Sequence, residues 1–549
     1  MPPEMALQLL DHKYPDSHIR AYAVRCLVAF GDEELASYLL QLVQVLQYEP
    51  LYLAPLASFL VERAILNPLL IGQGLLWHLQ AELYRPETEI KFGLLMEAIL
   101  LGLKPSLRGE FVAQIEFVDK MIELNDQLQA VPPSSRTVHL RKYLSNFVQT
   151  SSKAMDFIPG QPKTATSSAL SSAVGTVLLQ HLTTTVASSS PQATNSPSSL
   201  SLNSASPTVP QMPLSSSPEN GQDLPPASAA GLPRLPPPSA TRLVLPLSSS
   251  MAVKGVIVEK CKVMDSAAFP LWLTFDNEDP LGEPISILFK FGDDLRQDAL
   301  TLQMFTIMDR IWKREGLDLK MSLYKCLPTG PNMGIIEVVP NAETTAKIQK
   351  EAGGIIGAFK QTPLFNWLKT YNADAALLED ATENFTRSCA AYCVATYVIG
   401  VGDRHNDNIM VTKSGKLFHI DFAHFLGNII KFGVYKRERA PFVLTPEFAY
   451  VMGGEKSPGF ANFKALACTI YNLLRKHSSI FISLFELMLF AGLTQLTSYD
   501  DLAYMKKSLL TAVSSDSEAY ENFNKLIDES LSTKSTQLNF AIHIFAHPD

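Results

Sequence analysis

Residues 402–410 read GDRHNDNIM, and this stretch decides how we expect the chain to fold. It follows an uncharged run at 388–402, which is too short and too polar to span a bilayer of about 30 Å and therefore predicts a buried core helix. It leads into two short β-rich pieces, 409–412 and 417–420, joined by the turn sequence KSGK at 413–416. A polar loop therefore stands between a buried helix and a β-hairpin, where its side chains can gather at one site.

Oxygen-bearing side chains in and after this loop are suited to hold a divalent cation. Asp403 and Asn408 are five residues apart, the separation between the catalytic Asp and the metal-binding Asn of protein kinases. Asp421 follows the hairpin, eighteen residues after Asp403. Because two adjacent loops can bring Asn408 and Asp421 together, we expect both to bind Mg²⁺, which prefers oxygen ligands.

Lys290 is a candidate cation for a phosphate-bearing ligand of the same site. It ends the apolar strand predicted at 286–290, where an ammonium group has no packing reason to lie, and carboxylates that could pair with it follow at 293–298. Phosphoryl transfer needs a cation on the nucleotide phosphates, ligands for Mg²⁺ and a group beside the attacking hydroxyl. Each residue alone is compatible with a structural role, but Lys290, Asn408 and Asp421 in this order predict a phosphotransferase.

Composition excludes several classes of protein. The 549 residues are 46% hydrophobic and 18% charged, so the chain is not wholly disordered. A net charge of −8 argues against non-specific nucleic-acid binding, which depends on Lys and Arg. Six scattered cysteines without a CxxC pair predict a reducing compartment, no disulfide framework and no structural zinc. Neither a secretory signal nor a transmembrane segment is predicted.

Three regions differ in pattern. Up to about Asp126 the sequence is helical throughout and predicts a stacked solenoid, with Asp32 as the N-cap of one amphipathic helix. The apolar stripe of that helix consists of Leu35, Tyr38, Leu39, Leu42 and Leu46. Between 161 and 240, Pro, Ser and Thr supply 39 of 80 residues, which predicts a disordered linker. From Met251 onward the chain is globular.

The globular region begins with short β-rich pieces and continues with helices. The predicted strands are 256–263, 271–275, 286–290 and 334–339, and a helix is expected from about Asp293 to Arg314, stopped by Gly316. A small sheet-rich lobe followed by a mostly helical lobe is the order of a kinase.

The motifs now identify a family resemblance. GDDLRQD at 292–298, GDRHNDNIM at 402–410 and HIDF at 419–422 resemble the signature motifs of phosphoinositide 3-kinases. The order Asp-Arg-His, reversed from protein kinases, is specific to phosphoinositide kinases and their large protein-kinase relatives. YPDSHIRAYAVRCL at 14–27 and YLLQLVQVLQYE at 38–49 are similar to that family's helical accessory domain.

The expected fold is therefore multidomain: an all-α helical-repeat domain followed by an α+β bilobal lipid kinase domain. We expect a partial helical accessory (PIK) domain at 1–130, a Ser/Pro-rich disordered linker at 131–250 and the catalytic domain at 251–549. The N-lobe would cover about 251–338 and the C-lobe about 339–549. The family's usual upstream domains are not in this sequence, so we interpret it as N-terminally incomplete.

The resemblance also implies roles at matching positions. Lys290 would contact the ATP phosphates, and His405 would take the proton of the attacking hydroxyl with Asp403 orienting the loop. Which of His405 and Asp403 is the base stays open. The other implied ATP-binding residues are Met264, Ser266 of the phosphate loop, Trp272, Asp298, Tyr324, the hinge residues Glu337, Val338 and Val339, and Ile420.

Substrate choice would lie in the activation segment, from Asp421 to about Pro446. A cationic run there suits inositol-ring phosphates, because Arg offers bidentate contacts and Lys a point charge. The implied headgroup residues are Lys431, Lys436, Arg437 and Arg439. Two departures from the family pattern are Ala423, where the Asp-Phe-Gly motif has glycine, and Ala268, where class I enzymes usually have lysine. The pattern is class I-like with some class II-like features.

The resemblance implies an ATP- and Mg²⁺-dependent kinase of the inositol 3-hydroxyl. Its partners would be phosphoinositides at the membrane surface and regulatory or adaptor proteins. We expect a cytoplasmic protein that is recruited peripherally to membranes, the plasma membrane in particular. Two alternatives are a phosphatidylinositol 4-kinase, disfavoured by the cationic run, and a weakly active scaffold, disfavoured by intact Lys290, Asn408 and Asp421.

Overall fold

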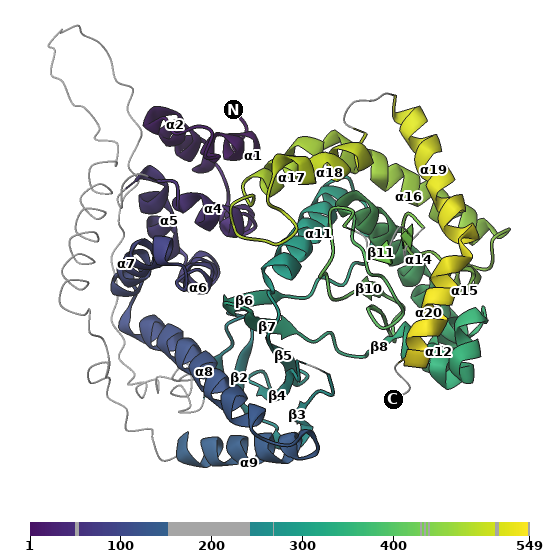
Figure 1. Cartoon of the computed structure of the whole chain (residues 1–549), viewed down its shortest axis with the longest axis horizontal. Coiled ribbons are helices and arrows are strands. Elements are labelled where there is room, and N and C mark those ends of the chain that lie inside the picture. The colour runs from purple at the N-terminus through teal and green to yellow at the C-terminus, as the bar shows by residue number, and fades with distance from the viewer. Residues whose placement is uncertain are drawn as a thin grey trace, which may run out of the picture.

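The computed structural model describes residues 1–49, 54–151, 242–266, 268–428, 431–432, 435–436, 440–510 and 515–546. They form a helical N-terminal region, a small sheet-rich lobe and a larger helical lobe (Figure 1). The predicted fold class is thereby confirmed. The Ser/Pro-rich residues at 161–240 lie outside the described part of the chain.

The N-terminal region consists of short helices followed by three longer ones, α7 to α9. Asp16 caps α2, accepting hydrogen bonds from the N–H groups of His18 and Ile19. The helices are α1 (Pro3–Ala6), α2 (Ser17–Leu27), α3 (Asp32–Ala36), α4 (Leu39–Leu46), α5 (Pro55–Leu66), α6 (Gln73–Ala81), α7 (Pro86–Gly102), α8 (Pro105–Gln129) and α9 (Pro133–Ser151). Two single-turn pieces, η1 (Leu7–Leu10) and η2 (Pro68–Gly72), join them.

The predicted N-cap role of Asp32 is wrong. Gly31 is the N-cap of α3, and Asp32 is the first helical residue. Its carboxylate accepts hydrogen bonds from Arg63 and Asn67 instead, which draws it away from the helix end. The apolar stripe is buried as expected, but it is divided between α3 and α4 by a break at 37–38.

The small lobe is a seven-stranded sheet in the order β1-β2-β4-β5-β7-β6, with β3 paired to β4. Its strands are β1 (Leu243–Val244), β2 (Ala252–Val256), β3 (Lys262–Val263), β4 (Leu271–Asn277), β5 (Ile285–Phe291), β6 (Cys326–Gly330) and β7 (Met333–Glu337). The predicted strand at 256–263 is wrong, because the turn η3 (Val258–Lys260) separates β2 from β3.

Helices α8 and α9 cover one face of this sheet (Figure 1). Residues such as Phe117 of α8 and Leu140 of α9 pack with Leu273 and Phe289 of the sheet in one apolar cluster. The predicted linker therefore begins too early, since 133–151 form a helix, and it ends too late, since β1 lies within it. The mostly polar composition of α9 hides a narrow apolar stripe that the sheet buries.

The larger lobe surrounds the helix that the uncharged run predicts. This helix, α14 (Ala375–Ile399), is largely buried and ends at Gly400, which adopts the left-handed backbone of a helix C-terminus. The other elements are α11 (Arg296–Arg314), β8 (Ala342–Thr344), α12 (Thr345–Gly353), η4 (Gly354–Phe359), α13 (Pro363–Tyr371), β9 (Ile409–Thr412), β10 (Leu417–His419), β11 (Lys431–Phe432), β12 (Tyr435–Lys436), α15 (Pro446–Val451), α16 (Pro458–Lys476), α17 (Ser478–Glu486), η5 (Tyr499–Leu502), α18 (Ala503–Ser508), α19 (Asp516–Ser532) and α20 (Lys534–Ala546).

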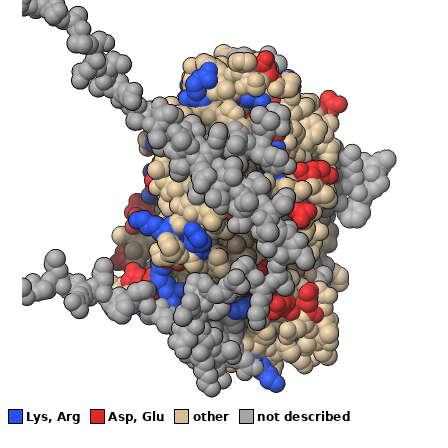
Figure 2. All heavy atoms as spheres, turned by 90° about the vertical axis from the view of Figure 1, so that its left-hand side faces the viewer, with Lys and Arg blue, Asp and Glu red and all other residues tan. Residues whose placement is uncertain are grey.

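Two further properties of the described residues are the length of their apolar helices and the charge of their surface. No single described helix is long and apolar enough to cross a membrane; α5 and the helical stretch at 68–81 pass such a test only together, with a bend of 120° between them. On the side of the molecule that carries α5 and α7, basic and acidic side chains both reach the described surface, so its charge is mixed (Figure 2).

Candidate active site

The β9–β10 hairpin places the two predicted metal ligands at the same end. Ile409 pairs with His419, and the N–H of Ile420 donates to the carbonyl of Asn408 at 3.0 Å. Asn408 immediately precedes β9, and Asp421 follows one residue beyond that hydrogen bond. The antiparallel register therefore brings their backbones together, as the sequence predicts.

The buried amide of Asn408 braces the loop before β9. Its Nδ2 donates to the carbonyl of Asp403 at 2.6 Å, and its Oδ1 accepts from the N–H of His405 at 3.0 Å. An amide oxygen has two lone pairs, so the same atom can accept this bond and bind a cation. The side chain of Asn408 therefore both fixes the conformation of the loop and is a candidate metal ligand.

Lys290 approaches this hairpin from the small lobe. On β5 it lies on the sheet face opposite that of the buried Phe289 and Phe291, and its Nζ is 3.5 Å from a carboxylate oxygen of Asp293. Burial opposes the charge of Lys290, but the carboxylates of Asp421, Asp298 and Asp293 outweigh it and raise the pKa above its ordinary value. Lys290 therefore remains an ammonium in an acidic setting that includes Asp421.

The first turn of α11 clamps the backbone next to Asp421 from both sides. Asp298 Oδ1 accepts from the N–H of Phe422 at 3.0 Å, and Gln297 Nε2 donates to the carbonyl of Phe422 at 2.7 Å. Burial raises the pKa of Asp298 to about 6, although its bond to Phe422 acts in the opposite direction. Gln297 lies inside the GDDLRQD motif, but no feature of the sequence indicates this role.

Arg404 is a second brace, and the sequence gives no indication of this role. Its buried guanidinium donates to the carbonyls of Gly402 (2.9 Å), Ile420 (2.8 Å) and Asp421, and lies 5.5 Å from the ring centre of Phe422. Asp421 has φ +60° and Asp403 φ +55°, in the left-handed region that non-glycine residues rarely adopt. Such strain persists only where surrounding contacts hold it, and Arg404 supplies three of them.

Ala423 does not disturb this segment. Its backbone lies outside the left-handed region, so a methyl group fits there without strain. Gln495 holds the backbone on both sides of it, donating to the carbonyl of Ala423 at 2.8 Å and accepting from the N–H of Phe425 at 3.0 Å. The substitution of the motif's glycine therefore leaves Asp421 in place.

Three residues predicted to contact the nucleotide lie on strand β4 and in the turn before it. Trp272 of β4 pairs with Leu288 of β5, and by strand alternation both lie on the same sheet face as Lys290. Met264 and the exposed Ser266 belong to the turn between β3 and β4, in which Met264 donates its N–H to the carbonyl of Pro270 at 2.9 Å.

The hinge and the back of the site are already bonded within the protein. Glu337 ends β7 and donates its N–H to the carbonyl of Lys325, while the N–H of Val338 donates to that of Ser286. Val339 lies beyond the strand and is partly buried. Tyr324 is buried, with its hydroxyl 3.4 Å from the carbonyl of His419, and burial raises its pKa. Ile420 is partly buried beside that carbonyl.

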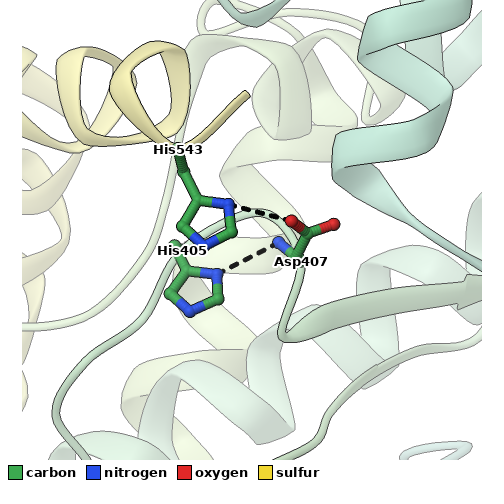
Figure 3. Close-up of side chains that lie close together, drawn as sticks. All are labelled: His405, Asp407 and His543. Atoms are coloured by element: carbon green, nitrogen blue, oxygen red, sulfur yellow. Dashed lines mark hydrogen bonds and ion pairs between the residues drawn. The ribbon is translucent and has the colours of Figure 1, made fainter. Parts of the chain in front are cut away.

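His405 lies in a cluster that the sequence does not indicate. Its Nδ1 accepts from the N–H of Asp407 at 3.3 Å, and its ring stacks on that of His543, with centres 3.9 Å apart and planes at 12° (Figure 3). His543 Nδ1 lies 2.8 Å from a carboxylate oxygen of Asp407. His543 comes from α20, more than 130 residues along the chain, and no local motif marks it.

Only two of the four predicted headgroup residues lie in the part of the chain that the structure describes. Lys431 of β11 pairs in register with Lys436 of β12. Arg437 and Arg439 lie outside the described residues.

Comparison with known proteins identifies the class to which this fold and site belong. A family model described as phosphatidylinositol 3- and 4-kinase matches residues 284–498. A second, described as the accessory (PIK) domain of the phosphoinositide 3-kinase family, matches residues 1–112. The chain thus combines a lipid kinase catalytic domain with the helical domain that accompanies it in phosphoinositide 3-kinases.

Individual relatives are similar in sequence to nearly the whole of this chain. Phosphatidylinositol 3-kinase 3 of Dictyostelium discoideum is 39% identical over 543 residues, which are 99% of this chain and 27% of the relative. The human phosphatidylinositol 4-phosphate 3-kinase C2 domain-containing subunit beta is 37% identical over 543 residues, 98% of this chain and 28% of the relative. The chain therefore belongs to the phosphoinositide 3-kinase family, and it spans about a quarter of the length of these relatives.

Proposed function

We propose that this chain transfers the γ-phosphoryl group of ATP to the 3-hydroxyl of the inositol ring of phosphatidylinositol and its phosphorylated forms. The observation that carries the proposal is that the carboxylate of Asp421, at the hairpin end that also holds Asn408, acts electrostatically on Lys290 and raises its pKa. The relatives named as phosphatidylinositol 3-kinases support the choice of the 3-hydroxyl.

The residues present fit ATP with Mg²⁺. Asn408 and Asp421 offer the hard oxygen ligands that Mg²⁺ prefers, and Lys290 would pair with the nucleotide phosphates. When bound, the cation neutralises charge on those phosphates. Asp298, with Gln297 and Arg404, keeps the segment that carries Asp421 in its strained conformation.

The other proposed nucleotide contacts come from strands of the small lobe, from the residues next to them and from the residue after β10. The partly buried Trp272, Met264 and Ile420 would flank the purine, and Ser266 would approach the phosphates from its exposed turn. The backbones of Glu337 and Val339 would bond to the adenine edge, with Val338 between them fixed to the sheet. The buried Tyr324 would support the site from behind through its contact with His419.

His405 or Asp403 would take the proton of the attacking hydroxyl. Both lie in the loop that Asn408 braces, one on each side of Arg404. Since Nδ1 of His405 accepts a hydrogen bond from Asp407, the neutral ring carries its own proton on Nε2 in this arrangement. His405 would therefore accept a proton through Nδ1, after that bond breaks, or Asp403 would accept it.

The activation segment would contact the lipid headgroup. Lys431, Lys436, Arg437 and Arg439 supply cations for ring phosphates, and the register of β11 and β12 puts the backbones of the first two opposite each other. We further propose that the protein acts in the cytoplasm, is recruited to membrane surfaces such as the plasma membrane, and works with regulatory or adaptor proteins.

Transfer of labelled phosphate to vesicles tests the proposal. Phosphatidylinositol, its 4-phosphate and its 4,5-bisphosphate are supplied separately, and the products are compared with lipids of known phosphate position. Product labelled at the 3-position is expected, with a loss of orders of magnitude for Asp421→Asn. Since the matched family model covers both 3- and 4-kinases, a 4-kinase is the second candidate, and label only at the 4-position would establish it. No label on any lipid would refute both.

A further inference from the structure

The cluster of His405, Asp407 and His543 has the composition of a transition-metal site. Each residue offers one ligand atom, and these atoms all lie within 4.8 Å of one another. Zinc bound at about 2.0–2.1 Å from tetrahedral ligands has those ligands about 3.3 Å apart, so shifts of roughly an ångström would close the cluster around an ion. Figure 3 shows both rings beside Asp407, with His543 approaching from α20.

We propose that these three side chains form a binding site for a zinc-like divalent cation that links α20 to the catalytic loop and inhibits phosphate transfer. Two imidazoles and one carboxylate suit Zn²⁺, Cu²⁺ or Ni²⁺, whereas Mg²⁺ prefers oxygen ligands alone. The site therefore distinguishes its cation from the Mg²⁺ expected at Asn408 and Asp421. Water can supply the remaining ligand, because the side chain of Asp407 is 39% exposed.

Neighbouring contacts hold the ligands close together. Asn539 of α20 donates through Nδ2 to the carbonyl of Arg404 at 3.2 Å, and Asn406 donates to that of Phe540 at 3.4 Å. The helix that carries His543 is thus already fixed to the loop that carries His405 and Asp407. Binding of a cation would therefore require only the three ligand side chains to move, with the backbones of the loop and of α20 in place.

The inhibitory effect follows from the use of His405. Coordination occupies an imidazole lone pair, which is then no longer able to accept a proton or a hydrogen bond. It also ties the loop that Asn408 braces to the C-terminal helix. This consequence rests on the proposed kinase function, whereas cation binding itself does not.

Cobalt(II) binding tests the site independently of any activity. Visible absorption of Co²⁺ reports nitrogen ligation, and zinc is added afterwards as a competitor. The chain and a His477→Gln control, changed at an exposed histidine at the end of α16, are expected to bind one Co²⁺ and to release it to Zn²⁺. His543→Gln is expected to bind about tenfold more weakly or worse, because even residues behind metal ligands affect affinity by 10–100-fold.

Two further measurements complete the test. Zn²⁺ is expected to raise the melting temperature of the unchanged chain but not that of His543→Gln, with Asp407→Asn as a second variant should the first fail to fold. Phosphate transfer with and without Zn²⁺ at fixed Mg²⁺ and ATP then gives an inhibition ratio for each variant. Equal Co²⁺ binding by the unchanged chain and His543→Gln, or none by either, overturns the site. Equal zinc inhibition in both overturns its inhibitory role.

Discussion

Replacing Glu447 with glutamine tests a buried network that reaches the catalytic loop. The carboxyl group of Glu447 accepts from Gln349 Nε2 at 2.6 Å and from the N–H of Leu364 at 3.1 Å. Gln349 in turn accepts from Asn406 Nδ2 at 2.8 Å. Glu447 is only 2% exposed, and burial raises its pKa to about 7 from an ordinary value of 4.5, against the opposing effect of both hydrogen bonds.

The raised pKa of Glu447 fixes the sign of a pH effect on stability. Below pH 4.5 the group is protonated in both the folded and the unfolded chain. As the pH rises toward 7, the unfolded chain releases this proton while the folded chain retains it, so the free energy of unfolding falls. The difference between pKa values of about 7 in the folded chain and 4.5 in the unfolded chain corresponds to about 3 kcal/mol of stability, lost mainly between pH 4.5 and 7.

Glutamine cannot ionise, so Glu447→Gln lacks this contribution at every pH. We expect its free energy of unfolding, minus that of the unchanged chain, to rise by about 3 kcal/mol between pH 4.5 and 7.5. Any hydrogen bond lost to Gln349 is independent of pH and does not affect this slope. The measurement is urea unfolding followed by tryptophan fluorescence, with Trp367 on α13 close to the bonded Leu364.

Glu455→Gln is the matched control, because Glu455 is exposed and lies eight residues further along the chain. Its difference from the unchanged chain should stay nearly constant over the same pH range. A difference for Glu447→Gln that is equally flat would refute the argument, since it would mean that Glu447 ionises in the folded chain as it does in water.

Three other changes have expected outcomes. Asp421→Asn should reduce phosphate transfer by orders of magnitude while the circular dichroism melt stays the same, and near-normal transfer would mean that the metal assignment is wrong. Neutralising Lys436 and Arg439 together should lower phosphate transfer to ring-phosphorylated lipids about tenfold and leave transfer to phosphatidylinositol unchanged. The loss of about 1.4 kcal/mol of charge-assisted hydrogen bonding corresponds to a tenfold lower rate. Equal loss on all lipids would contradict a role in headgroup recognition. Gly415→Ala should lower the melting temperature, because φ is +91° there and the added Cβ would overlap the carbonyl oxygen of Ala381 in α14. An unchanged melt would contradict this.

Local pattern was sufficient where one segment determines its own structure. The uncharged run gave α14, and the turn with Gly415 gave the β9–β10 hairpin with β9 at the predicted residues. The spacing of Asn408 and Asp421 then followed, because both flank the same hairpin. The prediction failed at Asp32, where a distant arginine, Arg63, competes for the carboxylate that local sequence assigns to a helix end.

The rest of the site depends on contacts between distant segments. The sequence shows His543 only as a histidine in a C-terminal helix, and nothing nearby indicates that its ring stacks on His405. Gln297 and Arg404 lie inside quoted motifs, but their partners are backbone carbonyls, which carry no sequence signal. The sequence does not distinguish helix α9 from the linker, because its apolar stripe is narrow and only the sheet shows what it packs against.

The first turn of α11 connects these regions physically. Arg296, its first residue, donates to the carbonyl of Ala491 at 2.6 Å and lies 3.6 Å from the carboxylate of Glu82, just after α6 of the accessory domain. The next two residues, Gln297 and Asp298, hold the backbone of Phe422 beside the candidate metal ligand. One helical turn therefore joins the accessory domain, through Glu82 and Arg296, to the segment that carries Asp421, through Gln297 and Asp298. The accessory domain is therefore part of the support of the catalytic site and more than a neighbouring module.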